Sequence, residues 1–125
     1  MQIRKSFTFE AAHVLPHHPG KCARLHGHSY RLEVALDGPL QAEGRACGMV
    51  QDFETVSRLV KESVIGELDH RSLNELLENP TAEQIAVWIW RRLVPALPQL
   101  TELVLWETRR SCVVLKEGDP LVRAG

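Results

Sequence analysis

Three histidines and a cysteine lie close together near the start of the chain, and these residue types are common zinc ligands. The segment Cys22-Ala-Arg-Leu-His26-Gly-His28 carries a thiol and two imidazoles, and His13 lies just upstream. Structural zinc sites are closed by four protein ligands, whereas catalytic sites use three and keep one position open for water or substrate. The obvious ligands here stop at three, so the pattern indicates a catalytic zinc centre.

Strand periodicity predicts that the three histidines converge, because side chains two residues apart on a strand point to the same face. One nearly apolar row ends at His13 and is interrupted only by Lys5; its other members are Ile3, Phe7, Phe9 and Ala11. A second row begins at His26 and His28 and continues with Tyr30, Leu32, Val34 and Leu36. If the two strands pair antiparallel, the end of the first lies beside the start of the second. Gly27, without a Cβ, would let a ligand approach the backbone between two of the histidines.

The segment between these strands is rich in proline and glycine, so we expect a loop that carries Cys22 over the histidine cluster. His17 and His18 lie in this loop beside prolines, and we interpret them as solvated or close to substrate rather than as ligands. A lone histidine is more often an ordinary core or surface residue. That interpretation does not account for a trio at the ends of two inward-facing rows.

Composition favours a single small domain in a reducing compartment. The chain has 125 residues, of which 44% are hydrophobic, and its formal net charge is -1. We expect one domain over residues 1–117 and a loose tail over 118–125. The three cysteines give an odd number without paired spacing, which favours the cytoplasm over a secreted disulfide framework. The absence of a basic tract and of a long apolar run argues against nucleic-acid and membrane partners.

The remaining pattern predicts an α+β domain. Asp52 reads as the N-cap of a helix that ends near Gly66, and Thr81 as the N-cap of a second helix. Two short strands follow over residues 102–108 and 111–116. The order is ββααββ, which predicts one four-stranded, mostly antiparallel sheet with two helices on one face. The other face and the two sheet edges would need cover, so we expect an oligomer.

Six motifs follow one another over nearly the whole chain: FTFEAAH ending at His13, CARLHGH ending at His28, GMVQDF at 48–53, LDH at 68–70, NPTAE at 79–83 and ET at 107–108. Each is weak alone, but in this order they resemble the 6-pyruvoyl-tetrahydropterin synthase family, and most closely its bacterial carboxy branch. The resemblance implies the tunnelling fold (T-fold), in which trimers close their sheets into a barrel and two trimers stack as a hexamer. It also implies active sites at subunit interfaces.

The resemblance also assigns roles to residues. It makes the three histidines the Zn²⁺ ligands, Cys22, Asp69 and His70 the catalytic set, and Glu107 and Thr81 substrate-binding residues. The chemistry agrees, since an ionised carboxylate accepts bidentately from the two-donor edge of a pterin. A zinc ion lowers the pKa of a nearby thiol, and a carboxylate can orient an imidazole for proton transfer.

The implied reaction converts 7,8-dihydroneopterin triphosphate to 6-carboxy-5,6,7,8-tetrahydropterin, with release of acetaldehyde and triphosphate, in queuosine (7-deazapurine) biosynthesis. The short interval from Cys22 to His26 resembles the carboxy branch, and formation of 6-pyruvoyl-tetrahydropterin is the alternative within the family. From a different class, a structural zinc module would need Cys22 as a fourth ligand. A metallohydrolase is disfavoured because no HExxH helix is present.

Overall fold

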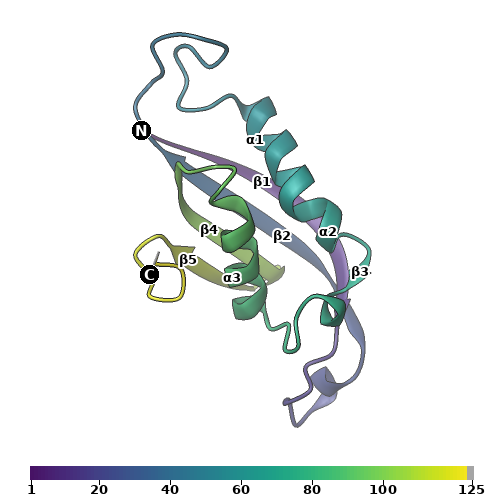
Figure 1. Cartoon of the computed structure of the whole chain (residues 1–125). Coiled ribbons are helices and arrows are strands. Elements are labelled where there is room, and N and C mark those ends of the chain that lie inside the picture. The colour runs from purple at the N-terminus through teal and green to yellow at the C-terminus, as the bar shows by residue number, and fades with distance from the viewer. Residues whose placement is uncertain (124–125) are drawn as a thin grey trace.

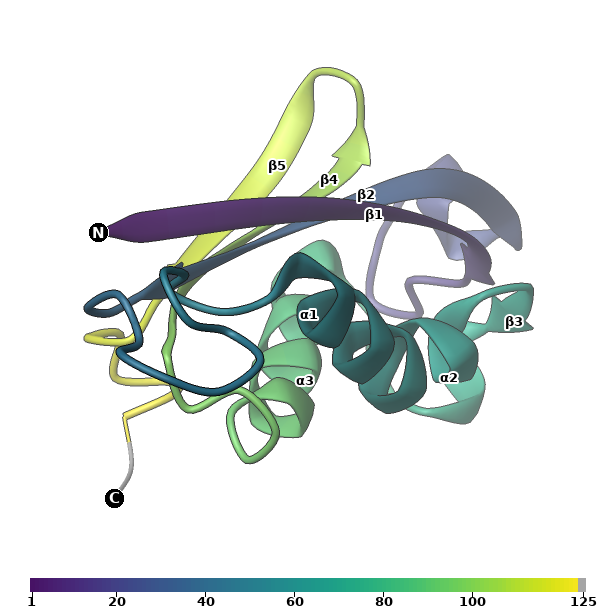
Figure 2. The same cartoon turned by 90° about the horizontal axis from the view of Figure 1, so that it is seen from above.

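The computed structural model describes residues 1–123 of the chain. One sheet carries the fold, with helices packed on one of its faces (Figures 1 and 2). Its strand order is β3-β1-β2-β4-β5. The elements follow the chain as β1 (Gln2–His13), β2 (His26–Asp37), α1 (Phe53–Val60), α2 (Gly66–Leu68), β3 (Arg71–Ser72), α3 (Ala82–Leu93), β4 (Leu100–Thr108) and β5 (Ser111–Lys116). The predicted α+β class is confirmed.

A long hairpin of β1 and β2 forms the centre of the sheet. The two strands pair antiparallel over their whole length, from Gln2 opposite Asp37 to His13 opposite His26. Burial alternates along β1 toward its end, as the two-residue pattern predicts. Phe9 stacks on Tyr30 across the hairpin, with ring centroids 4.9 Å apart, on the face that the helices cover. The register therefore brings the loop-side end of both inner rows to one place.

Two caps begin the helices where the sequence predicts them. The Asp52 side chain accepts a hydrogen bond from the Glu54 amide at 3.0 Å, and Thr81 Oγ1 accepts from the Gln84 amide at 3.2 Å. Such caps satisfy backbone donors that the first helical turn leaves free. The apolar stripe of α3 then packs against the sheet through its buried side chains, which include Ile85, Ile89, Trp90 and Leu93.

The first helix continues past its expected end near Gly66. A π-helical turn over Lys61–Ile65 (η2) joins α1 to α2, which ends at Leu68. A Cβ at Gly66 would lie 3.2 Å from the Lys61 carbonyl oxygen, so glycine suits this wide turn. The extra residue of a π turn rotates the helical positions after it. Leu68 is buried, and the next residue leaves the helix in an extended conformation.

The sheet has five strands where the sequence predicts four. The additional strand, β3, is two residues long and pairs parallel with Ala11–Ala12 near the end of β1. Two residues are too few to show an alternating pattern, and the partner lies far earlier in the chain. This pairing places the segment after α2 against the histidine end of β1 (Figure 1).

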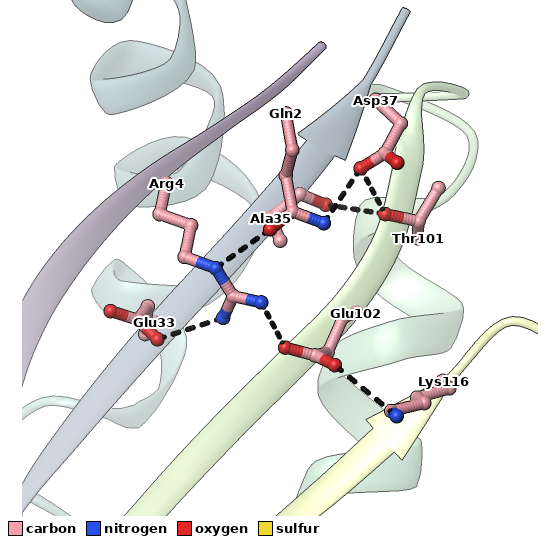
Figure 3. Close-up of polar contacts among 8 residues, drawn as sticks. All are labelled: Gln2, Arg4, Glu33, Ala35, Asp37, Thr101, Glu102 and Lys116. Carbon is pink, nitrogen blue, oxygen red and sulfur yellow. Dashed lines mark hydrogen bonds and ion pairs between the residues drawn. The ribbon is translucent and has the colours of Figure 1, made fainter.

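The face of the sheet away from the helices carries a polar network across four strands (Figure 3). Arg4 donates to Glu33 at 3.0 Å and to Glu102 at 2.5 Å, and Lys116 lies 3.8 Å from Glu102. Asp37 accepts from two neighbouring side chains, which lower the pKa of its carboxyl. This face is therefore compatible with a wet environment and needs no second apolar layer from the same chain.

After β5, the chain turns back toward the helices. The Arg91 guanidinium donates to the Leu121 carbonyl at 3.3 Å, and Val122 packs against the core. Residues 124 and 125, the end of the tail expected to be loose, lie outside the described residues, and the domain and tail boundary stays a prediction. Within residues 1–123, no helix has the length and apolarity needed to cross a membrane.

Candidate functional site

The structure brings His13, His26 and His28 together at the end of the hairpin. His13 is fully buried and lies directly opposite His26, while His28 lies opposite Ala11. The Nε2 atoms of His13 and His26 are 3.0 Å apart, and one ring nitrogen from each of the three histidines lies within 4.8 Å of the others. Three imidazoles at this spacing form a candidate metal site.

Two backbone carbonyls orient two of the rings. His13 Nδ1 lies 2.8 Å from the Pro80 carbonyl oxygen, and His26 Nδ1 lies 2.7 Å from the Arg24 carbonyl oxygen. A carbonyl oxygen only accepts hydrogen bonds, so each Nδ1 carries the proton and donates it. Each Nε2 is then left with a lone pair that faces the cluster. Hydrogen bonds of this kind commonly fix the tautomer of metal-bound histidines.

The three donors fit a zinc ion. Within residues 1–123, His28 Nε2 is a buried nitrogen without a hydrogen-bond partner, which is uncommon in folded proteins. Burial lowers the pKa of His28, so its ring favours the neutral form that binds metals. Two lone pairs facing each other at 3.0 Å repel unless a cation lies between them. Nitrogens bound tetrahedrally to zinc lie about 3.3 Å apart, given Zn–N bonds of about 2.0–2.1 Å.

Glu107 lies beside this trio, at an irregularity of β4. Its carboxylate oxygens are 4.0 Å from His13 Nε2 and 3.9 Å from His28 Nε2, too far for hydrogen bonds. It follows the buried Leu103 and Leu105 at two-residue spacing along the chain. The same residue lines a hollow of about 290 Å³ together with Thr81. Glu107 therefore separates the histidines from a space of a size suited to a small ligand.

Asp69 and His70 are in contact at the other side of the hairpin end. Asp69 Oδ2 lies 3.1 Å from His70 Nδ1, and Asp69 Oδ1 accepts from the Glu10 amide at 2.9 Å. The hydrogen bond from the Glu10 backbone amide lowers the pKa of the Asp69 carboxyl most, and the contact with His70 lowers it further. His70 has φ of 58°, in the left-handed region that non-glycine residues rarely adopt, and its side chain is 79% exposed. This backbone conformation presents the imidazole to the surface.

His70 and Glu107 line different hollows. His70 borders an open depression of about 460 Å³ whose wall also includes His28, Glu10 and Ser29. Within one chain, the predicted catalytic histidine and the predicted substrate carboxylate therefore do not share a pocket.

Cys22 lies in the loop between the two strands, in the short 3-10 turn Lys21–Ala23 (η1). It is half-buried, and its carbonyl oxygen accepts from the Leu15 amide at 3.0 Å. The cluster of ligand atoms found within residues 1–123 comprises the three histidines and does not include this thiol. His17 and His18 are both exposed in the same loop, and His18 Nδ1 accepts from the Gly20 amide at 2.9 Å.

Comparison with known proteins defines the class. The family model described as 6-pyruvoyl tetrahydropterin synthase matches residues 2–118. The chain therefore belongs to the 6-pyruvoyl tetrahydropterin synthase family and is an enzyme of that family. A solved 6-pyruvoyl tetrahydropterin synthase from Caenorhabditis elegans superposes with a TM-score of 0.82 at 24% identity, covering 93% of this chain and 94% of that one. This confirms the predicted tunnelling fold.

Two curated relatives are closer in sequence. The chain is 48% identical over 111 residues to a 6-carboxy-5,6,7,8-tetrahydropterin synthase from Synechocystis, covering 85% of each chain. It is 40% identical over 103 residues to a dihydroneopterin monophosphate aldolase from Pyrococcus furiosus, covering 80% of this chain and 83% of the relative. A pterin synthase or lyase role follows from these likenesses.

Proposed function

We propose that this chain is a zinc-dependent lyase of queuosine (7-deazapurine) biosynthesis. It converts 7,8-dihydroneopterin triphosphate and water to 6-carboxy-5,6,7,8-tetrahydropterin, acetaldehyde and triphosphate. The observation that carries the proposal is the trio of inward imidazoles, with Nδ1 of His13 and of His26 held by carbonyls, beside the Glu107 carboxylate at 3.9–4.0 Å. The likeness to the Synechocystis synthase supports the choice of product.

The hollow that Glu107 and Thr81 line is the proposed pterin site. A pterin offers its 2-amino group and N3–H as two parallel donors, which an ionised carboxylate accepts as a charge-assisted pair. The carboxylate also lies next to the histidines, so a pterin held there would extend its side chain toward the metal.

Zinc held by His13, His26 and His28 would polarise the side-chain hydroxyls of the substrate and lower their pKa. Cys22 is the proposed base, because its loop begins and ends at metal ligands. Asp69 holds the His70 ring through the 3.1 Å contact, which suits His70 as a proton donor or relay. These roles assign proton movement to Cys22 and His70 and orientation to Asp69, and none of the three side chains binds the proposed metal.

The reaction balances without an external oxidant. The nine carbons of the dihydropterin become the seven of the product and the two of acetaldehyde, as the bond between the first two side-chain carbons breaks. The first side-chain carbon is oxidised to a carboxyl group, while the pterin ring gains two hydrogens and the departing fragment is reduced as triphosphate leaves. No nicotinamide is required.

Two other reactions would use the same site. The first is triphosphate elimination to 6-pyruvoyl-tetrahydropterin, in which all three side-chain carbons stay on the pterin. The second is favoured by the likeness to the Pyrococcus aldolase, and would cleave the side chain of dihydroneopterin monophosphate to leave a phosphorylated two-carbon fragment. A closed structural zinc module is disfavoured, because Cys22 is not part of the ligand cluster.

We propose that the chain works as a homo-hexamer built from two trimers. Beyond the two-residue pairing with β3, the outer edge of β1 has no partner strand in the described chain, and β5 forms the opposite edge of the sheet. Free edges favour pairing with another copy. His70 is 79% exposed and lies away from the Glu107 hollow, which suits a site shared between subunits. Light scattering should give a hexamer, and a stable, active monomer would contradict this assembly.

A product assay tests the reaction. Purified protein is incubated with dihydroneopterin triphosphate, volatile aldehyde is trapped, and the pterin product is identified by mass spectrometry. Acetaldehyde in step with 6-carboxy-tetrahydropterin is the expected result. Release of triphosphate with all side-chain carbons retained would establish the pyruvoyl reaction instead. Turnover of the monophosphate to a phosphorylated two-carbon aldehyde would establish the aldolase reaction.

A further inference from the structure

Val14 comes directly after the proposed metal ligand His13, and its backbone amide and carbonyl are both hydrogen-bonded to the side chain of Asn74. The Val14 amide donates to Asn74 Oδ1 at 2.8 Å, and Asn74 Nδ2 donates to the Val14 carbonyl at 2.9 Å. Asn74 is half-buried in the 3-10 turn Leu73–Glu75 (η3). An amide side chain that makes both bonds reproduces what a neighbouring strand residue would provide.

This contact is the last of a series along the edge of β1. At Glu10, the Asp69 carboxylate accepts a hydrogen bond from the backbone amide at 2.9 Å. At Ala11–Ala12, the two residues of β3 supply backbone pairing. At Val14, Asn74 supplies side-chain bonds. The strand pairing covers two residues. At Glu10 the His70 backbone amide and the Asp69 side chain extend it, and at Val14 the Asn74 side chain extends it.

Val14 lies where three parts of the proposed site meet. On one side is His13, whose Nε2 faces the other two histidines. On the other side is Leu15, whose amide donates to the Cys22 carbonyl at 3.0 Å. Leu15 also lines the hollow of Glu107. The placement of Val14 therefore affects the metal ligand, the thiol loop and the substrate hollow together.

We propose that Asn74 is a positioning residue that aligns His13 with its metal and fixes the start of the Cys22 loop. Without its amide, both polar groups of Val14 lose their partner, and the loop over residues 14–25 loses its anchor at the end of β1. The catalytic and zinc consequences rest on the proposed function, whereas the effect on the Cys22 loop follows from the contacts of Val14 alone.

Asn74→Ala is the first variant, and the exposed neighbour Glu75→Ala is its matched control. Zinc affinity is measured by competition with a chromophoric chelator, and alkylation of Cys22 by peptide mass spectrometry with the exposed Cys47 as internal reference. We expect Asn74→Ala to bind zinc about ten-fold or more weakly, as for other residues behind metal ligands. Cys22 should be alkylated faster relative to Cys47. Glu75→Ala should match the wild type in both measurements.

Asn74→Asp keeps an acceptor for the Val14 amide but loses the donor to its carbonyl, so it should give intermediate zinc affinity. If Asn74→Ala does not fold, the zinc affinity and Cys22 alkylation of the near-isosteric Asn74→Asp variant test the proposal instead. Hydrogen exchange on the wild type adds a test without mutation, since the Val14 amide should be protected like those of the β1 ladder. A rapidly exchanging Val14 amide, or folded variants with wild-type zinc affinity and Cys22 alkylation, would overturn the proposal.

A turnover assay distinguishes a failure of the proposal for Asn74 from a failure of the proposed reaction. With dihydroneopterin triphosphate, Asn74→Ala should lower kcat about ten-fold or more while KM changes little, because misalignment affects chemistry more than binding. If the wild type does not turn over this substrate, the proposed reaction fails, and zinc affinity and thiol alkylation still judge the role of Asn74.

Discussion

His13 Nδ1 and the Pro80 carbonyl oxygen lie 2.8 Å apart, so the end of β1 is joined to the residue before the N-cap of α3. This hydrogen bond fixes the orientation of the His13 ring independently of any metal, because its acceptor is a backbone atom next to a capped helix. Thr81, the cap itself, lines the hollow beside Glu107. The proposed metal ligand and the proposed substrate pocket therefore share the start of α3 as a common support.

Cys22→Ala should retain zinc and folding but lose turnover. The ligand cluster does not include this thiol, so its removal leaves the three donors in place. Metal content, thermal denaturation and the product assay together check this. Loss of zinc in the variant would instead favour a closed site with Cys22 as a fourth ligand.

Glu107→Gln should weaken substrate affinity by roughly ten-fold or more. Losing the charge leaves the two-donor edge of the pterin poorly matched, and hydrogen bonds to charged groups contribute about 1.5–3 kcal/mol. The Michaelis constant of the variant is compared with that of the exposed control Glu117→Gln, which should behave as the wild type. An unchanged Michaelis constant and turnover in Glu107→Gln would remove this carboxylate from the site.

Asp69 should stabilise the fold in a pH-dependent way. Its folded pKa is lowered below the ordinary 3.8, first by the Glu10 amide and then by His70. A group with a lowered folded pKa contributes stability above its unfolded pKa and loses it as the pH falls through the folded value. The melting-temperature difference between wild type and Asp69→Asn should therefore shrink as the pH falls below 3.8. A difference that grows as the pH falls below 3.8 would contradict the ionised contact.

The histidine trio could be predicted because it obeys strand periodicity. His13, His26 and His28 lie on inward rows, and an antiparallel hairpin must bring the ends of those rows together. Glu107 lies two residues after Leu105 on β4, but its substrate-binding role is implied by the family resemblance and stays a prediction. For the three histidines, residue type and a spacing of two were sufficient, since long strands have few ways to pair.

Other features leave no periodic signal. Strand β3 has only two residues, and the π turn before α2 depends on packing along the whole helix. The hydrogen bond that His13 donates to Pro80 uses a backbone carbonyl as acceptor, which every residue has. Asn74 reaches a partner sixty positions earlier, and a single asparagine in a polar segment reads as an ordinary turn residue. Long-range contacts of this kind become visible only once the chain is folded.

Zinc stoichiometry combined with X-ray absorption spectroscopy tests the central claim most directly. The purified wild type should contain one zinc per chain. The zinc should have three imidazole nitrogens and a fourth oxygen or nitrogen neighbour at about 2.0–2.1 Å, and no sulfur neighbour. His26→Ala should lose the metal, while replacement of the exposed His18 in the loop between β1 and β2, as His18→Ala, should keep it. A sulfur neighbour at about 2.3 Å, or full zinc occupancy in His26→Ala, would contradict an open three-histidine centre.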